Sequence, residues 1–339
     1  HILRINMDLS IILVNYNVFD DIKSCISSIK DNIKAAEYEI IVVDNNSADR
    51  SITGLSSVYP EVKLILRESN GGFGAANNDA LKIAKGRFLF FVNPDILFID
   101  STPEKLMSFL KMNTDAGAAG PVQEKPGNGT ECYYSFFPGL YSRFAQEFGL
   151  YTKAPIMRNR FGKFWNSKIS EGKPFKVDWI IGSCLMLKRD VYDKIGGFDE
   201  AFFLYEEEVE LLYRMKKEGW SSYILPECKV IHNHHSSTSK LGVIFILYHE
   251  YRSRIIFSAK QFSLFTGILR KILTMDSIIF RFCYFTITNF VSTAVSKKRF
   301  LLYWDLIKLN FSSKKTVLNS RFVFSDYAEL FKGTANARL

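Results

Sequence analysis

The sequence predicts an α/β protein built on a mainly parallel β-sheet that is flanked by helices. Short apolar segments alternate with segments of helical length over the first hundred residues, which is the pattern of a three-layer parallel sheet. Residues Phe88–Val92 are all apolar or aromatic, as in a central strand that is buried on both faces. Several of the apolar segments end in small polar or acidic residues, which the carboxyl ends of parallel strands would gather at one edge.

The expected elements follow one another in a regular order. Asp20 and Asp21 begin a helix in which apolar residues recur every three or four positions up to Ile33. A glycine-rich turn at 70–74 leads into a second helix that runs to Ala84. The strands expected around these helices are 9–14, 39–44, 62–66 and 88–92.

The last of these strands ends at Asn93-Pro94-Asp95. Proline removes a backbone donor and pushes the residue before it out of the helical region, so the strand must stop there. Asp95 then stands at the carboxyl end of a central strand, where open α/β sheets bind ligands. A carboxylate at this place can hold a hard divalent cation against a substrate phosphate. Taken alone, such a tripeptide is more often only a turn.

Polar residues also follow the first two strands. Asn15-Tyr16-Asn17 follows the first strand and Asp44-Asn45-Asn46 follows the second. Asp44 can accept a hydrogen bond from a base or a ribose, and Tyr16 can lie against a base. The backbone of the glycine turn can approach a ligand closely where a helix begins. The three strand ends together favour a nucleotide site, whereas the glycines alone are equally explained by tight packing.

The second half of the chain starts irregularly. Residues 121–176 are rich in Gly, Pro, aromatic and basic residues, and we expect long loops and short helices that lie over the sheet and grip a substrate. Order returns in a strand over 177–187 that Gly182 interrupts, which suggests a close approach of backbone.

Two clusters of ionisable residues follow. Four carboxylates fall within residues 206–210, and on a helix Glu207 and Glu210 share a face while Glu208 points elsewhere. A solvated helix start, where acids favour the macrodipole, explains such residues equally well. Three histidines within residues 232–235 suggest a metal site, although surface histidine runs are common.

The basic charge lies in the last hundred residues. The chain has a net charge of +9 from 44 Lys+Arg and 35 Asp+Glu. Residues 240–339 hold 16 basic and 5 acidic residues, or +11, which leaves 28 basic and 30 acidic residues, or −2, in residues 1–239. Apolar clusters separated by basic residues suit amphipathic helices in an anionic membrane interface. These clusters, which could instead pack onto the rest of the chain, are Ile244–Leu247, Ile255–Phe257, Phe262–Leu269 and Ile279–Phe285.

Other features limit the class of protein. The five cysteines are scattered without a CxxC pair, which argues against a zinc site and a disulfide framework and for a reducing compartment. The longest uncharged run, 282–296, has 15 residues, and a bilayer takes roughly 20, so we expect no transmembrane helix. We expect residues 1–7 to stand outside the fold, residues 8–239 to form the α/β domain, and residues 240–339 to form a helical region.

Five motifs occur in a characteristic order along the chain. With the basic aromatic segment Tyr251-Arg252-Ser253-Arg254, they resemble the family 2 glycosyltransferases with the GT-A fold, especially the rhamnosyltransferase-like branch of bacterial surface-polysaccharide (O-antigen or capsule) synthesis. The resemblance covers about residues 8–257. The motifs are Asp44-Asn45-Asn46-Ser47, Asn70-x-Gly72-Phe73-x-x-x-Asn77-Asn78, Asn93-Pro94-Asp95, Gly197-Phe198-Asp199-Glu200 and Phe202-Phe203-x-Tyr205-x-Glu207-Glu208.

The resemblance implies roles for matching residues. Asp95 stands in the family's Asp-x-Asp metal motif, whose first position is Asn here, and His232 stands where relatives carry a metal-binding His; the implied cofactor is Mg²⁺ or Mn²⁺. Glu208 is the implied base, with Glu207 as the alternative, because relatives have Glu-Asp where this chain has Glu-Glu. The candidate nucleotide-binding residues are Asn15, Tyr16, Asn17, Asp44, Asn46, Gly72, Asn77 and Asn93.

We therefore expect an inverting sugar transfer. The donor would be a nucleoside diphosphate sugar, such as dTDP-rhamnose or a UDP-sugar, and the acceptor a hydroxyl of a glycan or lipid-linked oligosaccharide. Trp179 and Gly182 would lie on the acceptor side. The base would deprotonate the acceptor, and the metal would neutralise the departing diphosphate. The expected location is cytoplasmic, peripheral on the inner face of a bacterial plasma membrane.

Three other functions were weighed against this one. A sugar-phosphate nucleotidyltransferase shares this sheet but needs a glycine-rich, basic phosphate loop directly after the first strand, where this chain has Asn15-Tyr16-Asn17. Nucleic-acid binding by the basic tail lacks a recognised motif, and the carboxylates would repel phosphate without a metal, so we expect no nucleic-acid partner. A catalytically silent scaffold is distinguished only by a donor-hydrolysis assay.

Overall fold

A computed structural model describes most of the chain. The described residues are 7–48, 51–127, 129–131, 134–137, 155–233, 243–261 and 293–320, with the short pieces 271–272, 274–275 and 279. They fall into two compact units. The first unit contains residues 1–137, 162–199 and 208–237, and the second contains residues 138–161, 200–207 and 238–339. Six of the seven residues expected to stand outside the fold, 1–6, lie outside the described residues.

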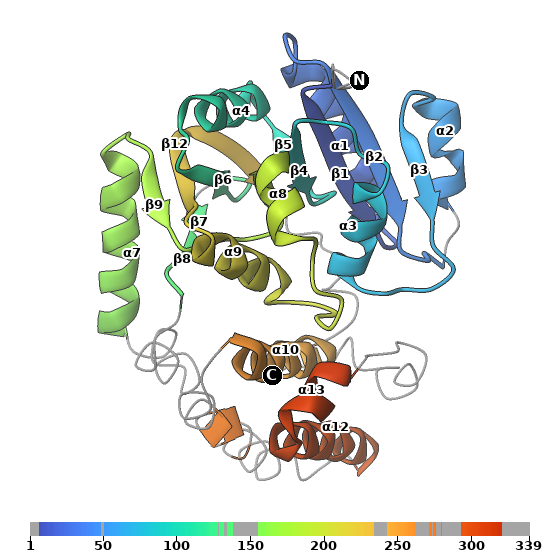
Figure 1. The fold of residues 1–339 in the computed structure, drawn as a ribbon. Coiled ribbons are helices and arrows are strands. Elements are labelled where there is room, and N and C mark those ends of the chain that lie inside the picture. The colour runs from blue at the N-terminus through green and yellow to red at the C-terminus, as the bar shows by residue number, and fades with distance from the viewer. Residues whose placement is uncertain are drawn as a thin grey trace. The chain divides into compact units, whose positions relative to one another are not determined.

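A mainly parallel sheet forms the centre of the first unit (Figure 1). Its strands are β1 (Leu9–Asn15), β2 (Tyr38–Asp44), β3 (Lys63–Leu66), β4 (Phe88–Val92), β5 (Ile96–Phe98), β6 (Ala116–Glu124), β7 (Thr130–Glu131), β9 (Phe175–Val177), β11 (Cys184–Lys188) and β12 (Ser221–His232). They lie in the order β3-β2-β1-β4-β11-β6-β12-β5, with β7 beside β6 and β9 beside β12. The pairs β1–β2, β1–β4, β2–β3 and β6–β12 are parallel, whereas β11 runs antiparallel between β4 and β6. The predicted α/β sheet is confirmed.

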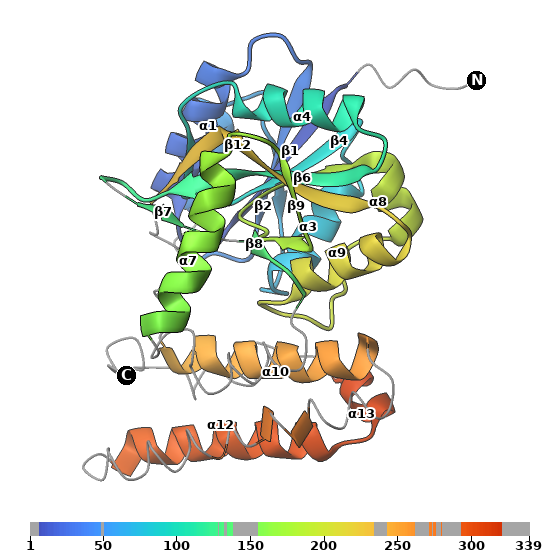
Figure 2. The same ribbon diagram turned by 90° about the vertical axis from the view of Figure 1, so that its left-hand side faces the viewer.

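Helices cover both faces of this sheet (Figure 2). One face is covered by α1 (Phe19–Asn32), the short η1 (Ser51–Gly54) and α2 (Leu55–Val58), and α4 (Thr102–Met112). The other is covered by α3 (Phe73–Leu81), α7 (Pro155–Ser170), α8 (Arg189–Ile195) and α9 (Glu207–Lys217). A separate pair of short strands, β8 (Tyr134–Ser135) and β10 (Trp179–Ile180), lies beside them.

Strand β4 explains why its sequence is apolar without interruption. Phe90 and Val92 pack into the core under α1 and α4, whereas Leu89 and Phe91 pack into the core under α3 and α9. Successive side chains of a strand point to opposite faces, and both faces here are covered. All five residues of β4 are therefore buried.

The stretch 121–176 is more regular than the sequence predicts. The expectation of long loops and short helices is wrong for α7, a 16-residue helix. The helix is anchored by the buried Trp165, whose ring lies 5.1 Å from that of Tyr134 and 5.8 Å from that of Phe175, centroid to centroid. Most of its other described side chains are exposed or half-buried. A single large anchor leaves little periodicity in the sequence to predict a helix.

The second unit contains the helices α10 (Val243–Gln261), α12 (Thr293–Phe311) and α13 (Lys314–Asn319). Both α12 and α13 pack against α10 (Figure 2). None of the described helices is long and apolar enough to cross a membrane. Most of the uncharged run 282–296 lies outside the described residues.

Replacing Phe91 by Ala should destabilise the first unit strongly. The ring is fully buried and makes an edge contact with the Phe198 ring at a centroid distance of 5.0 Å. A large-to-small change at such a site costs about 3–5 kcal/mol of unfolding free energy. Urea unfolding followed by circular dichroism measures the effect, and the exposed Val58→Ala serves as the control. Equal unfolding midpoints for the two variants would contradict the assignment of β4 as a core strand.

Candidate active site

The polar residues that follow β1, β2 and β4 meet at one edge of the sheet. The register pairs Asn15 with Asp44 and Leu13 with Val92, so the three strands end at nearly the same height. The parallel direction of the strands therefore brings together three segments that the sequence analysis selected independently. These segments are Asn15-Tyr16-Asn17, Asp44-Asn45-Asn46 and Asn93-Pro94-Asp95.

Asp44 organises the first part of this edge. Its buried carboxylate accepts hydrogen bonds from Asn15 Nδ2 at 2.7 Å and from Ser47 Oγ at 2.6 Å, both on Oδ1. The Ser47 amide donates to Oδ2 at 3.0 Å. Each carboxylate oxygen has two acceptor sites, so Oδ2 keeps capacity for one donor from a ligand. Asp44 thus holds the two strand ends together and can still contact a nucleotide.

Asn45 fixes the glycine turn before α3, a role that the sequence analysis missed. Its Oδ1 accepts from Arg67 Nη1 at 3.0 Å and from the Gly71 amide at 3.1 Å. Its Nδ2 donates to Asn70 Oδ1 at 2.8 Å and to the Gly72 carbonyl at 3.2 Å. Gly72 has φ +88°, a conformation that favours glycine, and directly precedes α3. The available signal was the position of Asn45 inside the Asp44–Ser47 motif.

Two asparagines at this edge adopt the left-handed conformation. Asn17 has φ 59° and Asn46 has φ 63°. Asn17 Oδ1 accepts from the Ala48 amide at 2.8 Å, which ties the loop after β1 to the loop after β2. Asn46 is exposed and Tyr16 is half-buried, so both side chains can face a ligand. Non-glycine residues with positive φ are uncommon and gather at functional sites.

The other predicted nucleotide residues differ in accessibility. Asn77 is buried within α3, where its Nδ2 donates to the Phe73 carbonyl at 2.9 Å, and its nucleotide-binding role stays a prediction. Asn93 is half-buried at the edge, and its amide donates to the Ser183 carbonyl at 2.8 Å. Asn78, which the sequence analysis quoted without a role, bonds the amide and carbonyl of Phe198, both at 2.9 Å.

The structure brings Asp95 and His232 together. β5 begins directly after Asp95 and pairs antiparallel with the end of β12, so His232 stands opposite Ile96. The Asn233 amide donates to the Asp95 carbonyl at 2.9 Å. His232 Nε2 then lies 3.2 Å from Asp95 Oδ1, and the two residues are 6% and 3% exposed. This approach lacks hydrogen-bond geometry, and neither carboxylate oxygen of Asp95 accepts a hydrogen bond.

A buried carboxylate without hydrogen-bond donors is unfavourable unless a positive charge or a proton compensates it. Among the described residues, no group of three or more His, Cys, Asp and Glu side chains forms a metal cluster, and the two candidate ligands described here are Asp95 and His232. Cys25 lies close, with Sγ 3.8 Å from the Asn93 carbonyl. Burial, and then the charge of Asp95, raises the pKa of this thiol far above its usual range. Asp95 and His232 fit a divalent ion that completes its coordination with substrate oxygens.

Glu208 lies beside Gly182. Glu208 is the second residue of α9 and is buried. A Cβ at position 182 would lie 3.0 Å from the Phe73 ring and 3.7 Å from Glu208 Cβ. The predicted close approach at Gly182 is thus real, but side chains approach and not backbone, so the prediction was wrong in that detail. Glu207, the alternative base, is also buried and opens α9.

Glu210 has a structural role. Its carboxylate pairs with Arg214, whose Nε lies 2.9 Å from both carboxylate oxygens. Arg214 also donates from Nη2 to the Gly197 carbonyl at 2.7 Å and from Nη1 to the Ile195 carbonyl. The pair therefore anchors the turn Gly196–Phe198 to α9, and Glu210 is not available as a base.

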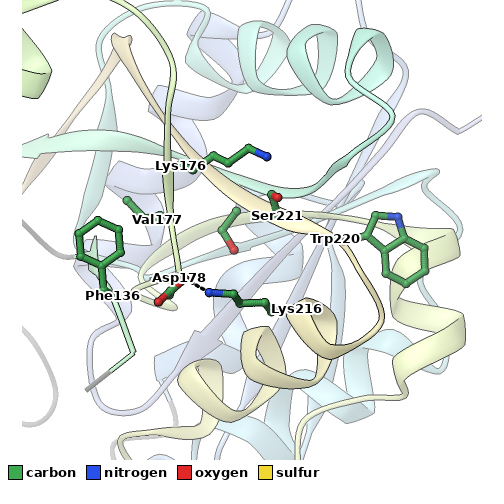
Figure 3. A pocket seen from close by; sticks show the side chains of 8 residues that line it. Phe136, Lys176, Val177, Asp178, Lys216, Trp220 and Ser221 are labelled. Carbon is green, nitrogen blue, oxygen red and sulfur yellow. Dashed lines mark hydrogen bonds and ion pairs between the residues drawn. The ribbon is translucent and has the colours of Figure 1, made fainter. Parts of the chain in front are cut away.

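A small pocket of about 100 Å³ lies at the other end of β12 from His232 (Figure 3). Ser221 and Ser222 of β12 line it together with Phe136 and Trp220. The ammonium group of Lys216 points to Asp178, with which it forms an ion pair (Figure 3). Trp179, predicted to bind the acceptor, follows Asp178 and donates from Nε1 to the Phe136 carbonyl at 3.3 Å. None of the predicted catalytic or metal residues lines this pocket.

Comparison with known proteins identifies the family. The model of the family described as "Glycosyl transferase family 2" matches residues 10–196, which run from β1 to α8 and include Asp44, Asp95 and Gly182. The chain belongs to glycosyl transferase family 2. The family that the sequence motifs resemble is thereby confirmed, and the protein is a glycosyltransferase.

Curated relatives of this glycosyltransferase include rhamnosyltransferases. The chain is 27% identical over 237 residues to the N-acetylglucosaminyl-diphospho-decaprenol L-rhamnosyltransferase of Mycobacterium tuberculosis. The matched region covers 66% of this chain and 75% of that relative. The chain is 25% identical over 249 residues to rhamnosyltransferase WbbL of Escherichia coli, covering 68% and 85%. It is 27% identical over 264 residues to the low-salt glycan biosynthesis hexosyltransferase Agl10 of Haloferax volcanii, covering 76% and 77%.

Solved structures confirm the GT-A-like fold. The mannosyltransferase PcManGT from Pyrobaculum calidifontis, in complex with GDP-Man and Mn²⁺, matches with a TM-score of 0.52 and 14% identity over 91% of this chain and 82% of its own. GalNAc-T7 with UDP, GalNAc and Mn²⁺ matches with a TM-score of 0.54 and 12% identity over 84% of this chain and 58% of its own. At these identities the likeness concerns the fold.

Replacing Asn45 by Ala should loosen the glycine turn. The change removes four hydrogen bonds made by a buried amide. Partners such as the Gly71 amide then lose their hydrogen bond, which lowers the free energy of unfolding by about 1–3 kcal/mol. We expect a lower unfolding midpoint together with weaker nucleoside diphosphate binding, measured by calorimetry. Asn166→Ala, at an exposed position of α7, is the control and should change neither quantity. Unchanged stability and nucleotide affinity in Asn45→Ala would contradict this role.

Proposed function

We propose that this glycosyltransferase moves a sugar from a nucleoside diphosphate donor to a hydroxyl of a glycan or lipid-linked acceptor, with inversion at the anomeric carbon. The observation that carries the proposal is the Asp95–His232 pair at the carboxyl edge of the sheet. A buried carboxylate without hydrogen-bond donors, 3.2 Å from an imidazole nitrogen, suits a divalent cation that binds a diphosphate. The same edge carries Asp44 and the glycine turn, which suit the nucleoside part.

The donor side is assigned to the loops after β1 and β2. Asp44 Oδ2 has capacity for a donor from the base or ribose, and Tyr16 and the exposed Asn46 flank it. Asn15 and Asn17 support this arrangement through their bonds to Asp44 and to the Ala48 amide. Because two relatives are named as rhamnosyltransferases, we propose dTDP-rhamnose as the first donor to test, with UDP-sugars second.

The cofactor is proposed to be Mg²⁺ or Mn²⁺, held by Asp95 and His232. Two solved structures of the same fold contain Mn²⁺ with a nucleotide or nucleotide sugar, which supports a divalent ion. When bound, such an ion supplies neutralisation of the negative charge that develops on the departing diphosphate. Asp95 would hold the ion through a carboxylate oxygen, and His232 through a ring nitrogen.

Glu208 is the proposed general base. The acceptor hydroxyl gives its proton to the Glu208 carboxylate while its oxygen forms a bond to the anomeric carbon. The bond between that carbon and the phosphate oxygen breaks, and the nucleoside diphosphate leaves with the electron pair. Displacement from the opposite face needs one base and no carboxylate nucleophile, which gives inversion. A Cβ at position 182 would come within 3.0 Å of the Phe73 ring, so a glycine there lets this segment pack closely beside Glu208.

The acceptor is proposed to approach along residues 179–182. Trp179 is half-buried and can stack on a sugar ring, and Gly182 lies beside Glu208 at the far end of this segment. The proposed acceptors are intermediates of cell-surface polysaccharide synthesis, because the relatives are named for rhamnosyl transfer and glycan biosynthesis. Transfer to a lipid-linked acceptor would take place at the inner face of a bacterial plasma membrane.

Replacing Asp95 by Ala should abolish the metal-dependent part of nucleotide binding. The change removes the only carboxylate proposed to bind the ion. Thermal shift with UDP, GDP and dTDP, each with and without Mn²⁺, measures the loss, because a ligand that binds only the folded state raises its stability. Asp31→Ala, which removes an exposed carboxylate of α1, is the matched control. A Mn²⁺-dependent shift that persists in Asp95→Ala would refute the metal assignment.

The variants Glu208→Gln and Glu207→Gln separate the two candidate bases. Glutamine keeps the shape of Glu208 but takes no proton, so turnover should fall by about 10²–10⁴-fold while donor affinity stays the same. Glu207→Gln should retain most of the activity. Initial rates with saturating donor and calorimetry with the nucleoside diphosphate give the two quantities. The opposite pattern would assign the base to Glu207.

A further inference from the structure

Helix α10 does not offer the membrane surface that its sequence predicts. Phe245, Ile256 and Phe257 are buried, and no described side chain of the helix is exposed. The prediction that the clusters Ile244–Leu247 and Ile255–Phe257 face lipid is therefore wrong for the residues that can be described, since α10 is the central helix against which α12 and α13 pack. The clusters 262–269 and 279–285 lie largely outside the described residues.

The basic residues of α10 are also directed inward. Arg252 is buried and donates to the carbonyls of Ala201 and Ser320, both at 2.8 Å. Arg254 pairs with Glu250. Burial lowers the pKa of Lys260 below its usual value. These cations stabilise the interior of the second unit and cannot at the same time bind lipid headgroups.

Helix α12 shows the opposite arrangement. Its buried side consists of Leu302, Tyr303, Leu306 and Asn310. Its other side exposes Leu301, Trp304, Lys308 and Phe311, which we call the α12 stripe. Spacings of three, four and three residues place these side chains on one face of the helix, over a length of about 15 Å. The apolar members are unusually accessible, at 44% for Leu301, 47% for Trp304 and 78% for Phe311.

The two charged residues of α12 whose side chains are described, Asp305 and Lys308, have different surroundings. The Lys308 ammonium lies 5.8 Å from the centroid of the Trp304 ring. Asp305 is turned toward α10, where the Tyr248 hydroxyl donates to its Oδ2 at 2.6 Å. Lys315 of α13 is exposed as well. The α12 stripe thus combines two aromatic rings with one cation, Lys308, within a segment (residues 240–339) whose net charge is +11.

We propose that the α12 stripe contacts an anionic lipid bilayer. A helix with large apolar side chains and a lysine on one exposed face lies in the plane of the interface, with the rings among the upper acyl chains and the Lys308 ammonium group at the phosphates. Trp304 fits the boundary because an indole side chain combines a large apolar ring with one polar N–H. The positive charge selects anionic lipids over zwitterionic ones. This contact needs no sugar substrate, so it is independent of the proposed transfer reaction.

The test compares vesicle binding of the full chain with that of two double variants. The double variant Trp304→Gln with Phe311→Gln removes both aromatic rings of the α12 stripe. Val58→Gln with Met112→Gln removes two equally exposed apolar side chains from the first unit and is the matched control. Co-sedimentation uses phosphatidylcholine vesicles with and without phosphatidylglycerol. We expect binding that requires phosphatidylglycerol, weakens with salt, falls about tenfold or more in the α12 variant and is unchanged in the control.

Tryptophan fluorescence gives a second readout that does not depend on removing the rings. Of the four tryptophans, only Trp304 lies in the second unit. Vesicles with brominated acyl chains should quench part of the emission of the wild type, and Trp304→Phe, which keeps an apolar ring, should bind while losing that quenching. Circular dichroism checks that each variant is folded. If the α12 double variant is not folded, the single variant Phe311→Gln replaces it, because Phe311 is the most exposed residue of the stripe.

Three results would overturn the proposal. Vesicle binding by the wild-type protein that does not increase with phosphatidylglycerol would show that it has no such surface. Binding and quenching that survive the α12 variants place the contact elsewhere. A dimer in sedimentation velocity that the α12 variant dissociates, without any vesicle binding by the wild type, would show that the stripe binds a second copy of the chain.

Discussion

The main-chain pairing between the end of β12 and β5 holds the candidate active site together. β5 starts immediately after Asp95, and its antiparallel register with β12 places His232 opposite Ile96. The Asn233 amide closes the pairing on the Asp95 carbonyl at 2.9 Å. Backbone bonds of this kind are insensitive to side-chain identity, so they fix a carboxylate and an imidazole beside each other although the two residues are far apart in the sequence. The proline at 94 makes this possible because it ends β4 and frees the chain to cross to β12.

Two buried carboxylates at the same edge illustrate how the environment divides their roles. Asp44 accepts three hydrogen bonds from Asn15 and Ser47, so its charge is compensated by the protein itself and its position is fixed. The carboxylate of Asp95 accepts none, and His232 Nε2 lies 3.2 Å from its Oδ1. A buried charge of the second kind is tolerated where a ligand supplies the compensation. The first carboxylate therefore builds the site, and the second is suited to bind.

The second unit sorts similar residues into interior and surface by the same physical rule. Arg252 and Arg254 of α10 are held by carbonyl and carboxylate acceptors, and the acid of α12, Asp305, is held by Tyr248. Long basic side chains that have such acceptors can be buried, whereas those without them stay at the surface. Among the described side chains of α12, Lys308 and the rings of Trp304 and Phe311 are therefore exposed, whereas Asp305 is held by α10.

The sequence by itself determined the sheet and the composition of its carboxyl edge. The strand Phe88–Val92 has the predicted bounds, because an apolar run that ends at proline is a local signal. Asp44, Asn93 and Asp95 reach one edge simply because the strands before them are parallel. The tertiary structure alone decided the partners of the amides and charges. Asn45 and Asn78 acquire structural roles from loops that meet only in the fold, and α7 depends on the surroundings of Trp165. Likewise α10 is interior and α12 exposed although both carry apolar and basic residues, since exposure depends on which faces other helices cover, and composition carries no information about that.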